Sequence, residues 1–320
     1  MKASGGRVLF VGVGTSGCRI VSLLQSQGVE AGYLYASLDE EDLTGREGSI
    51  DMNGWDDQEI ARKLDGQLIG RSVVFVVAGL GGTSGSNLAP RVSRAASRYA
   101  IKAFAVSLLP FKYQKWMEYR AGVALAKLKK YSDGVLVVDR EQFVEDSFEE
   151  LPLNRLYEMI DGKVADALEA LFRRQDGDQP VVELRKLLKM METGQATLEV
   201  RDLSQGFDDG LAALVRRAYS LDPTSVDELM IFSNGNRPIT FEQAKFSSEG
   251  LKNLLGDEMR LHYSSRISEK TGSVIAMIAS IKGGAKMRIY DPLNEILGAR
   301  TLDEEPELGL SIDLGIGAID

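Results

Sequence analysis

The stretch that decides the fold is GLGGTSGSNLAP at residues 79–90, which follows directly on the apolar run VVFVVA at residues 73–78. A buried strand therefore runs straight into glycines and hydroxyl side chains, and Ala89 and Pro90 are predicted to open a helix. Glycines let the backbone curl, hydroxyl groups offer donors, and the helix turns its positive end towards the loop. This order of elements is typical of a loop that holds phosphate groups.

A second loop of the same kind lies near the start of the chain. GVGTSG at residues 12–17 continues the apolar run at residues 7–13 and matches the pattern G-x-G-x-x-G. Asp39 follows the next predicted strand, at the spacing of the acid that binds ribose in dinucleotide-binding proteins. Alone, the pattern also fits a tight turn that needs glycine only for packing. Two such loops after neighbouring strands suit a triphosphate better than a dinucleotide.

The first half of the chain alternates buried β-branched runs with amphipathic helices, which predicts a doubly wound α/β domain with a mostly parallel sheet. In such sheets ligands bind beyond the carboxyl ends of the strands. The second half predicts a smaller α+β domain, in which the runs at residues 258–268 and 273–283 pair as an antiparallel hairpin. The expected parts are an N-terminal domain over 1–155, a connecting helix over 156–176, a C-terminal domain over 177–290 and a tail over 291–320.

Composition excludes several classes of function. The 320 residues carry a net charge of −9, which argues against a general role on nucleic acid or on an anionic membrane surface. No apolar run reaches the roughly 18 residues of a membrane-spanning helix, and a single cysteine excludes an intramolecular disulfide. The single histidine, His262, has no second ligand-type residue nearby, so neither a zinc site nor a His-based triad is expected. We expect a cytoplasmic protein without direct membrane insertion.

Taken in order, these segments resemble the tubulin/FtsZ superfamily. AGLGGTSGSNLAP at residues 78–90 is similar to the signature loop of that family, and GVGTSGCRIV at 12–21 is similar to its first nucleotide loop. SDGVLVVDREQF at 132–143 and GKVADALEAL at 162–171 continue the match in register. The resemblance covers roughly residues 7–290 and is closer to archaeal FtsZ-like and CetZ-type members than to bacterial FtsZ.

The resemblance implies a protein that binds GTP or GDP and assembles head to tail into protofilaments, with nucleotide between subunits. It leaves open whether Mg²⁺ accompanies the nucleotide, and whether other FtsZ-like proteins or a tail-binding adaptor are partners. Cell division and cell shape both remain as roles. The positions that the resemblance assigns to the nucleotide site are Gly12, Gly14, Thr15, Ser16, Gly17, Cys18, Asp39, Gly79, Gly81, Gly82, Thr83, Ser84, Gly85, Ser86, Gln114, Asp139, Arg140, Gly162 and Asp166.

Two of these loops depart from the family pattern. Thr83 and Asn87 stand where the signature loop has glycines, and the added Cβ of Thr83 is expected to change the shape of the loop. Arg140 stands where an asparagine reads guanine, between Asp139 and Glu141. An acid can accept hydrogen bonds from guanine N1 and N2, whereas an arginine cannot.

Further departures affect the ribose and the base. Asp166 on the long helix keeps the polar base contact, but the aromatic residue one turn earlier, which stacks on the base, has become Gly162. Gln114 takes the place of the glutamate that holds the ribose. Cys18 next to the first loop is interpreted as a small residue at a helix start rather than a reactive thiol.

The largest departure concerns hydrolysis. The resemblance implies a loop with an NxDxxD motif after the central helix, whose acids polarise water at the nucleotide of the next subunit. Residues 173–194 lack this motif, although Asp176, Asp178 and Glu183 are acids nearby. Glu183 is the candidate catalytic residue, but a solvated acid at the start of the next helix is the simpler interpretation. Loss of a water-positioning group lowers the rate by orders of magnitude, so slow or absent hydrolysis is expected.

Three functional hypotheses follow. The first is an FtsZ/tubulin-like GTP-binding protein that forms cytoskeletal protofilaments, with weak or absent GTP hydrolysis. The second keeps the same fold as a structural or regulatory subunit that binds nucleotide without turnover. The third is an NAD(P)-dependent dehydrogenase that uses residues 12–17 and Asp39. This third hypothesis lacks a catalytic His or Tyr–Lys pair and leaves residues 79–90 unexplained.

One basic face is also predicted. Arg91, Arg94 and Arg98 fall on one side of the helix after the signature loop. A solvated helix face is the simpler interpretation, and a lateral contact between filaments is the alternative.

Overall fold

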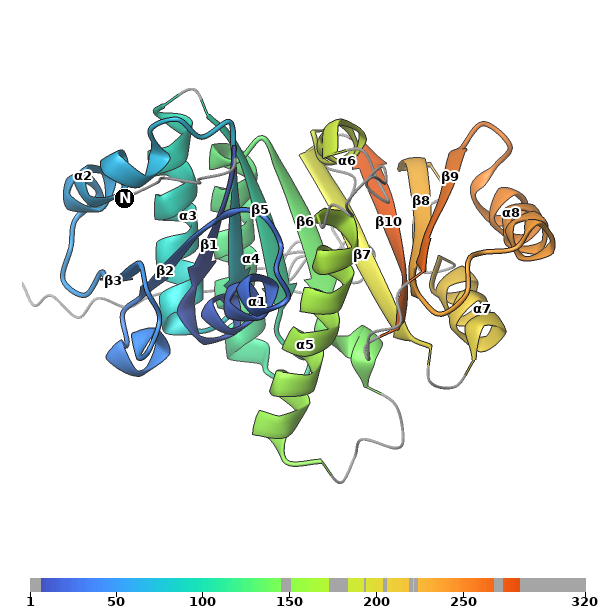
Figure 1. Ribbon diagram of the computed structural model, residues 1–320, viewed down its shortest axis with the longest axis horizontal. Helices are drawn as coiled ribbons and strands as arrows, with labels where there is room; N and C mark the ends of the chain where they lie inside the picture. Colours follow the sequence, from blue (N-terminus) through green and yellow to red (C-terminus); the bar gives the residue numbers. More distant parts are fainter. Residues whose placement is uncertain are drawn as a thin grey trace, which may run out of the picture.

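A single mixed sheet of ten strands runs through the described part of the chain. This computed structural model describes residues 7–99, 101–144, 151–172, 184–192, 194–203, 206–218, 221, 224–267 and 273–282. The strands lie in the order β3-β2-β1-β4-β5-β6-β7-β10-β8-β9, and helices cover both faces (Figure 1). The mostly parallel, doubly wound arrangement predicted from the sequence is confirmed.

The first half of the chain forms parallel strands joined by helices. The strands are β1 (Val8–Val13), β2 (Gly32–Ser37), β3 (Ser49–Asp51), β4 (Val73–Gly79), β5 (Lys102–Leu109) and β6 (Gly134–Asp139). The helices are α1 (Gly14–Ser26), α2 (Asp57–Leu68), α3 (Thr83–Ser97) and α4 (Lys115–Tyr131), with short 3-10 helices η1 (Glu40–Leu43) and η2 (Arg140–Phe143). Because these strands pair in parallel, their carboxyl ends share one edge of the sheet.

The second half extends the same sheet. Its elements are α5 (Leu153–Phe172), α6 (Leu184–Met191), β7 (Gly194–Asp202), α7 (Phe207–Ala218), β8 (Val226–Gly235), α8 (Phe241–Leu255), β9 (Arg260–Ile267) and β10 (Val274–Lys282). β7 pairs in parallel with β6, so the sheet is continuous between the two halves. The division into separate domains therefore stays a prediction, and the tail over 291–320 lies outside the described residues.

The predicted hairpin between β9 and β10 is wrong. β10 lies between β7 and β8 and is antiparallel to both, whereas β9 pairs in parallel with β8 at the edge of the sheet. Residues 274–281 of β10 are buried, as expected of an inner strand, whereas β9 is half-exposed, as expected of an edge strand. Alternation of apolar and polar residues along 258–268 and 273–283 indicates that both segments are strands. It does not say which strands lie next to each other.

Three hydrophobic clusters define the layers. Helices α1, α5 and α6 pack on one face of the sheet with Phe10 and Phe75, and α2, α3 and α4 pack on the other face with Leu9 and Val76. Adjacent strand residues therefore point to opposite layers, as the period of a strand requires. Helices α7 and α8 cover Ile275 of β10 in the third cluster. Among the described residues, no helix combines the length and the apolar character needed to cross a membrane.

Replacing Gly17 by alanine should destabilise the fold. A Cβ at this position would lie 2.1 Å from the carbonyl oxygen of Val77, so α1 would have to move away from β4. Overpacking of this kind costs about 1–3 kcal/mol. The matched control is Gly66→Ala inside α2, where a Cβ would meet nothing within 4 Å and should gain about 0.5–1 kcal/mol. Urea unfolding compares the two, and a Gly17→Ala protein as stable as the control would contradict the packing.

Candidate functional site

A cleft lies at the carboxyl edge of the parallel strands. Its volume is about 600 Å³, and it opens where β1, β2, β4 and β6 end. The lining residues are Thr15, Ser16, Arg19, Asp39, Asp42, Gly79, Leu80, Gly82, Thr83, Ser84, Gly85, Gln114, Met117, Arg140, Asn154 and Tyr157. Both glycine loops therefore meet at one cavity, as their place after parallel strands predicts.

Helices α1 and α3 begin at the cleft and lack a capping side chain. The N-cap residues of α1 and α3 are Val13 and Gly82, and neither makes a side-chain hydrogen bond to the helix. By contrast, α2 and α8 each begin with a complete capping box. The first N–H groups of α1 and α3 thus stay available at the cleft, together with the positive ends of two helix dipoles. This pairing favours an anionic ligand.

The second loop is shorter than the sequence predicts. Helix α3 begins at Thr83 rather than at Ala89, and Pro90 lies inside it at the cost of one intrahelical hydrogen bond. The backbone turns at Gly81, which has a φ of 98°, and the Gly81 N–H donates to Ser86 Oγ at 2.7 Å. Thr83 is therefore the first helical residue, and its Cβ is compatible with that position.

Serine side chains fasten this helix to the neighbouring strand. Ser84 Oγ accepts a hydrogen bond from the N–H of Leu38 at 3.3 Å and lies 3.2 Å from Ser37 Oγ, just beyond β2. Ser37 Oγ in turn donates to a carboxylate oxygen of Asp42 at 2.7 Å. The second loop, the end of β2 and the acidic segment after it are thus one connected rim of the cleft.

Arg140 forms the floor of the cleft. Its Nη2 donates to Ser16 Oγ at 2.9 Å, its Nη1 donates to the carbonyl of Leu109 at 3.3 Å, and its guanidinium lies 4.9 Å from the ring centre of Tyr157. The residue is only 3% exposed. Its charge therefore needs a buried partner, which is Asp161, 3.9 Å away.

Asp161 on α5 is held between two arginines. Its side chain is fully buried and accepts a hydrogen bond from Arg19 Nη1 at 2.8 Å. Burial raises the pKa of Asp161 to about 6, and the positive charges of Arg140 and Arg19 oppose that rise. The cluster ties α1, η2 and α5 together directly beneath the first loop.

The side chain of Tyr157 is fixed at the mouth of the cleft. Its hydroxyl donates to Gln114 Oε1 at 3.1 Å, and the same oxygen accepts from the N–H of Phe111 at 3.2 Å. The ring also packs against the ring of Phe111, with centroids 5.5 Å apart. Tyr157 is thus held in place before any ligand binds.

Ten of the residues that the sequence assigns to the site line the cleft. They are Thr15, Ser16, Asp39, Gly79, Gly82, Thr83, Ser84, Gly85, Gln114 and Arg140. The remaining assigned residues do not line it. They are Gly12, Gly14, Gly17, Cys18, Gly81, Ser86, Asp139, Gly162 and Asp166.

Several of those remaining residues support the loops or lie elsewhere. Cys18 is buried, and burial raises the pKa of its thiol to about 12, which fits the packing role expected for it. Asp139 accepts a hydrogen bond from Arg217 Nη2 at 2.8 Å. Asp166 accepts one from Gln27 Nε2 at 2.8 Å, and a Cβ at Gly162 would meet nothing within 4 Å.

Sequence reasoning missed three residues on α5, which are Asn154, Tyr157 and Asp161, and Arg19 in the second turn of α1. The expected spacing, an aromatic residue one turn before an acid, is present at Tyr157 and Asp161, one turn before the positions 162 and 166 that were assigned. The signal was therefore in the sequence, but a helix offers the same spacing at several registers. Asn154, one turn earlier still, also lines the cleft.

The catalytic residues that the sequence predicts fall outside the part of the chain that the structure describes. Glu183, Asp176 and Asp178 lie outside the described residues. Within the part of the chain that the structure describes, no group of three or more His, Cys, Asp or Glu residues is placed to hold a metal ion.

A parallel α/β sheet with uncapped helix N-termini at one cleft is typical of proteins that bind phosphate groups and nucleotides. A family model described as Tubulin/FtsZ family, GTPase domain, matches residues 55–147. Cell division protein FtsZ 2 of Methanocaldococcus jannaschii is 24% identical over 306 residues, which are 87% of this chain and 80% of that protein. The chain is thus similar to archaeal FtsZ over most of its length, and residues 55–147 match the GTPase domain of the tubulin/FtsZ family.

Solved structures share the fold. An FtsZ dimer of M. jannaschii gives a TM-score of 0.69 at 19% identity and covers 87% of this chain and 88% of its own. CetZ2 of Haloferax volcanii, solved as a GTPγS-bound protofilament, gives 0.65 at 20% identity and covers 91% and 98%. The fold expected from the resemblance is thus confirmed.

Replacing Asp161 by asparagine should change how stability depends on pH. The carboxyl has a pKa of about 6 in the folded protein against an ordinary value of 3.8, so folding favours its protonated form. The wild type should therefore lose up to roughly 3 kcal/mol relative to Asp161→Asn as the pH rises from about 4 to about 6. Urea unfolding of both proteins below and above that window measures the difference. An identical pH dependence would show that the pKa of Asp161 is not raised.

Proposed function

We propose that this protein binds GTP or GDP in the cleft and assembles head to tail into protofilaments, with weak or absent GTP hydrolysis. The observation that carries the proposal is the meeting of two uncapped helix N-termini at one cavity of about 600 Å³. A row of phosphates needs several convergent N–H donors, and the first turns of two helices supply them.

The phosphates are held by the two loops. The first turns of α1 and α3 provide backbone N–H groups, and the side chains of Thr15, Ser16, Thr83 and Ser84 provide hydroxyl donors. Arg140 acts beneath them as a positioning residue, because its guanidinium holds Ser16 on one side and Tyr157 on the other.

The base lies at the start of α5. Tyr157 provides an aromatic ring for stacking, and together with Asp161 it repeats the spacing of an aromatic residue one turn before a polar one. The side-chain amide of Asn154 also lines the cleft and can accept from guanine N1 or N2 while it donates to O6. These two residues replace the assigned positions Gly162 and Asp166 in this proposal.

Mg²⁺ fits the cleft as a partner of the phosphates rather than as a resident ion. Asp39 and Asp42 line the cleft beside hydroxyl groups, and hard oxygen ligands of this kind suit Mg²⁺. Mg²⁺ is commonly bound by one or two carboxylates together with phosphate oxygens and waters. When bound, it would neutralise phosphate charge.

Weak hydrolysis follows from the sequence after α5. In a head-to-tail filament this segment would approach the nucleotide of the next subunit, and residues 173–194 lack the NxDxxD motif. The cellular role is that of a cytoskeletal subunit in which nucleotide binding is retained and turnover is reduced.

The purified protein should carry guanine nucleotide. We expect GTP or GDP in the extract of the denatured protein, pelleting that depends on GTP, and phosphate release far slower than assembly. Phosphate release as fast as assembly would contradict the reduced turnover. NAD(P) in the extract would contradict the whole proposal. A pelleting control with GDP separates nucleotide-dependent assembly from aggregation.

Replacing Tyr157 by alanine should weaken guanine nucleotide binding by roughly 5- to 100-fold, because stacking of a base on an aromatic ring contributes about 1–3 kcal/mol. Tyr157→Phe keeps the ring and should stay close to wild type. Gly162→Ala is the matched control one turn along α5, and its affinity should not change. Fluorescence titration with a labelled GTP analogue measures all three, and loss of affinity in Gly162→Ala alone would restore position 162 to the base site.

A further inference from the structure

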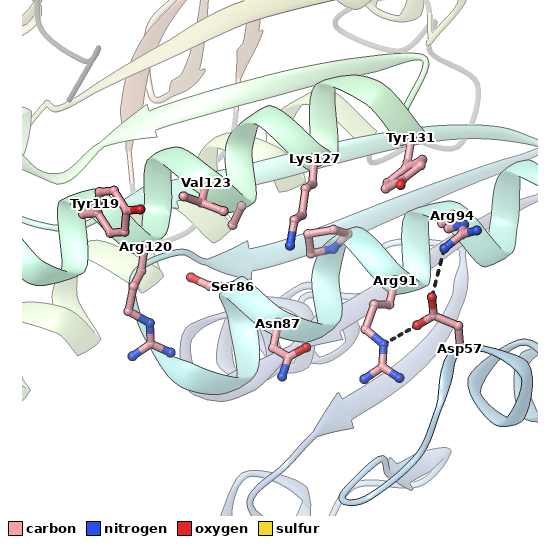
Figure 2. Close-up of a pocket in the computed structure, with 12 residues that line it drawn as sticks. Asp57, Ser86, Asn87, Arg91, Arg94, Tyr119, Arg120, Val123, Lys127 and Tyr131 are labelled. Carbon is pink, nitrogen blue, oxygen red and sulfur yellow. Dashed lines mark hydrogen bonds and ion pairs between the residues drawn. The ribbon is translucent and has the colours of Figure 1, made fainter. Parts of the chain in front are cut away.

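A second cavity, of about 550 Å³, lies between α3 and α4 on the layer that faces away from α1 and α5. It is separate from the nucleotide cleft, and Figure 2 shows side chains from α3, α4 and the start of α2 around it. We name it the α3–α4 groove. Its lining residues are Asp57, Ser86, Asn87, Pro90, Arg91, Arg94, Tyr119, Arg120, Val123, Ala124, Lys127 and Tyr131.

The groove is basic although the chain carries a net charge of −9. Arg91 and Arg94 share the carboxylate of Asp57, at 2.6 and 3.0 Å. Arg120 and Lys127, two turns apart on α4, have no ion-pair or hydrogen-bond partner among the described residues. Four basic side chains and one acidic one therefore leave a local positive charge, with two cations ready to bind an anion.

The same groove offers apolar surface. The side chains of Tyr119 and Val123 are 45% and 42% exposed. Along α4, Tyr119 lies next to Arg120, and Val123 lies between Arg120 and Lys127 (Figure 2). Trp116, 70% exposed, stacks on Tyr119 with ring centroids 5.9 Å apart. The surface therefore matches a ligand that combines carboxylates with aliphatic side chains, rather than a simple anion.

We propose that the α3–α4 groove binds the acidic segment LDEEPELGLSIDL at residues 302–314 of the same chain. This segment places four carboxylates within residues 303–307 and then alternates leucine and isoleucine with small residues. Its acidic part pairs with Arg120 and Lys127, and its apolar part covers Tyr119 and Val123. Within this acidic chain the groove and the segment have opposite charge.

The sheet topology brings the two within reach. β10 ends at Lys282 opposite Gly194 of β7, and the next residue of β7, Gln195, pairs with Val135 at the start of β6. Since α4 ends just before β6 begins, the last residue of β10 lies two strands away from the basic end of α4. Residues 283–302 can span at most roughly 70 Å, which is ample for that separation.

Attachment to the same chain also favours binding. A tethered segment has an effective concentration in the millimolar range, so a few exposed ion pairs and a small apolar contact are enough to hold it. The two helices of the groove also supply residues of the nucleotide cleft, Thr83–Gly85 from α3 and Met117 from α4. A segment bound in the groove therefore contacts the same two helices that line the nucleotide cleft.

Carbodiimide cross-linking of the full chain tests this contact, because it joins a lysine amine to a carboxylate with no spacer. We expect Lys127 to be linked to residues 303–313 of the same molecule, and the link to be lost at high salt. Lys245 and Lys252 on α8 are the internal controls and should form no such link. Equal linkage of Lys127 and the α8 lysines to this segment would overturn the proposal, and so would covalent dimers in place of an intrachain link.

A charge-swap series keeps the test specific. Arg120→Glu leaves Lys127 in place, and should lower the Lys127 cross-link by about three-fold or more through loss of one ion pair and added repulsion. Adding Glu304→Arg to Arg120→Glu should restore the yield, whereas Glu304→Arg alone should lower it. Thermal unfolding of the three variants confirms that each is folded. Failure of the double variant to recover would contradict the pairing of the segment with the groove.

Discussion

The close packing of two helices against strand β4 is the constraint on which the site depends. A Cβ at Gly17 would lie 2.1 Å from the carbonyl oxygen of Val77, and a Cβ at Gly85 would lie 2.0 Å from that of Gly79. Because glycine is present at both positions, α1 and α3 approach opposite faces of one strand and begin at the same edge of the sheet. Two helix N-termini therefore converge at one cleft. Together they form a stronger anion site than either would form alone.

A buried charge cluster lies beneath the first loop. Arg140 reaches Ser16 and Tyr157, Asp161 balances its charge, and Arg19 joins from α1. A buried ion pair adds little net stability, but it orients every group it bonds. Arg140 thus positions Ser16 and Tyr157 from beneath the cleft, and its presence does not disrupt the two phosphate loops.

Sequence patterns predicted the strands, the parallel first half and both loops, because burial and glycine spacing are local signals. They failed where the outcome depends on distant contacts. The run ending in Ile267 and the run ending in Lys282 are both strands, but β8 separates them, and the demand of β10 for neighbours on both sides decided it. Pro90 suggested a helix start, yet the helix begins at Thr83, since the N–H groups there face the cleft and need no cap. Tyr157 was missed because the spacing along a helix repeats every turn.

In this structure, one nucleoside triphosphate should contact both loops of the cleft. A crystal structure of the protein with GTPγS tests it most directly. The account predicts phosphate oxygens within hydrogen-bonding distance of the first N–H groups of α1 and α3, and the guanine ring stacked on Tyr157. A nucleotide bound away from α3, or one whose base lies at Gly162 and leaves Tyr157 uncovered, would contradict it.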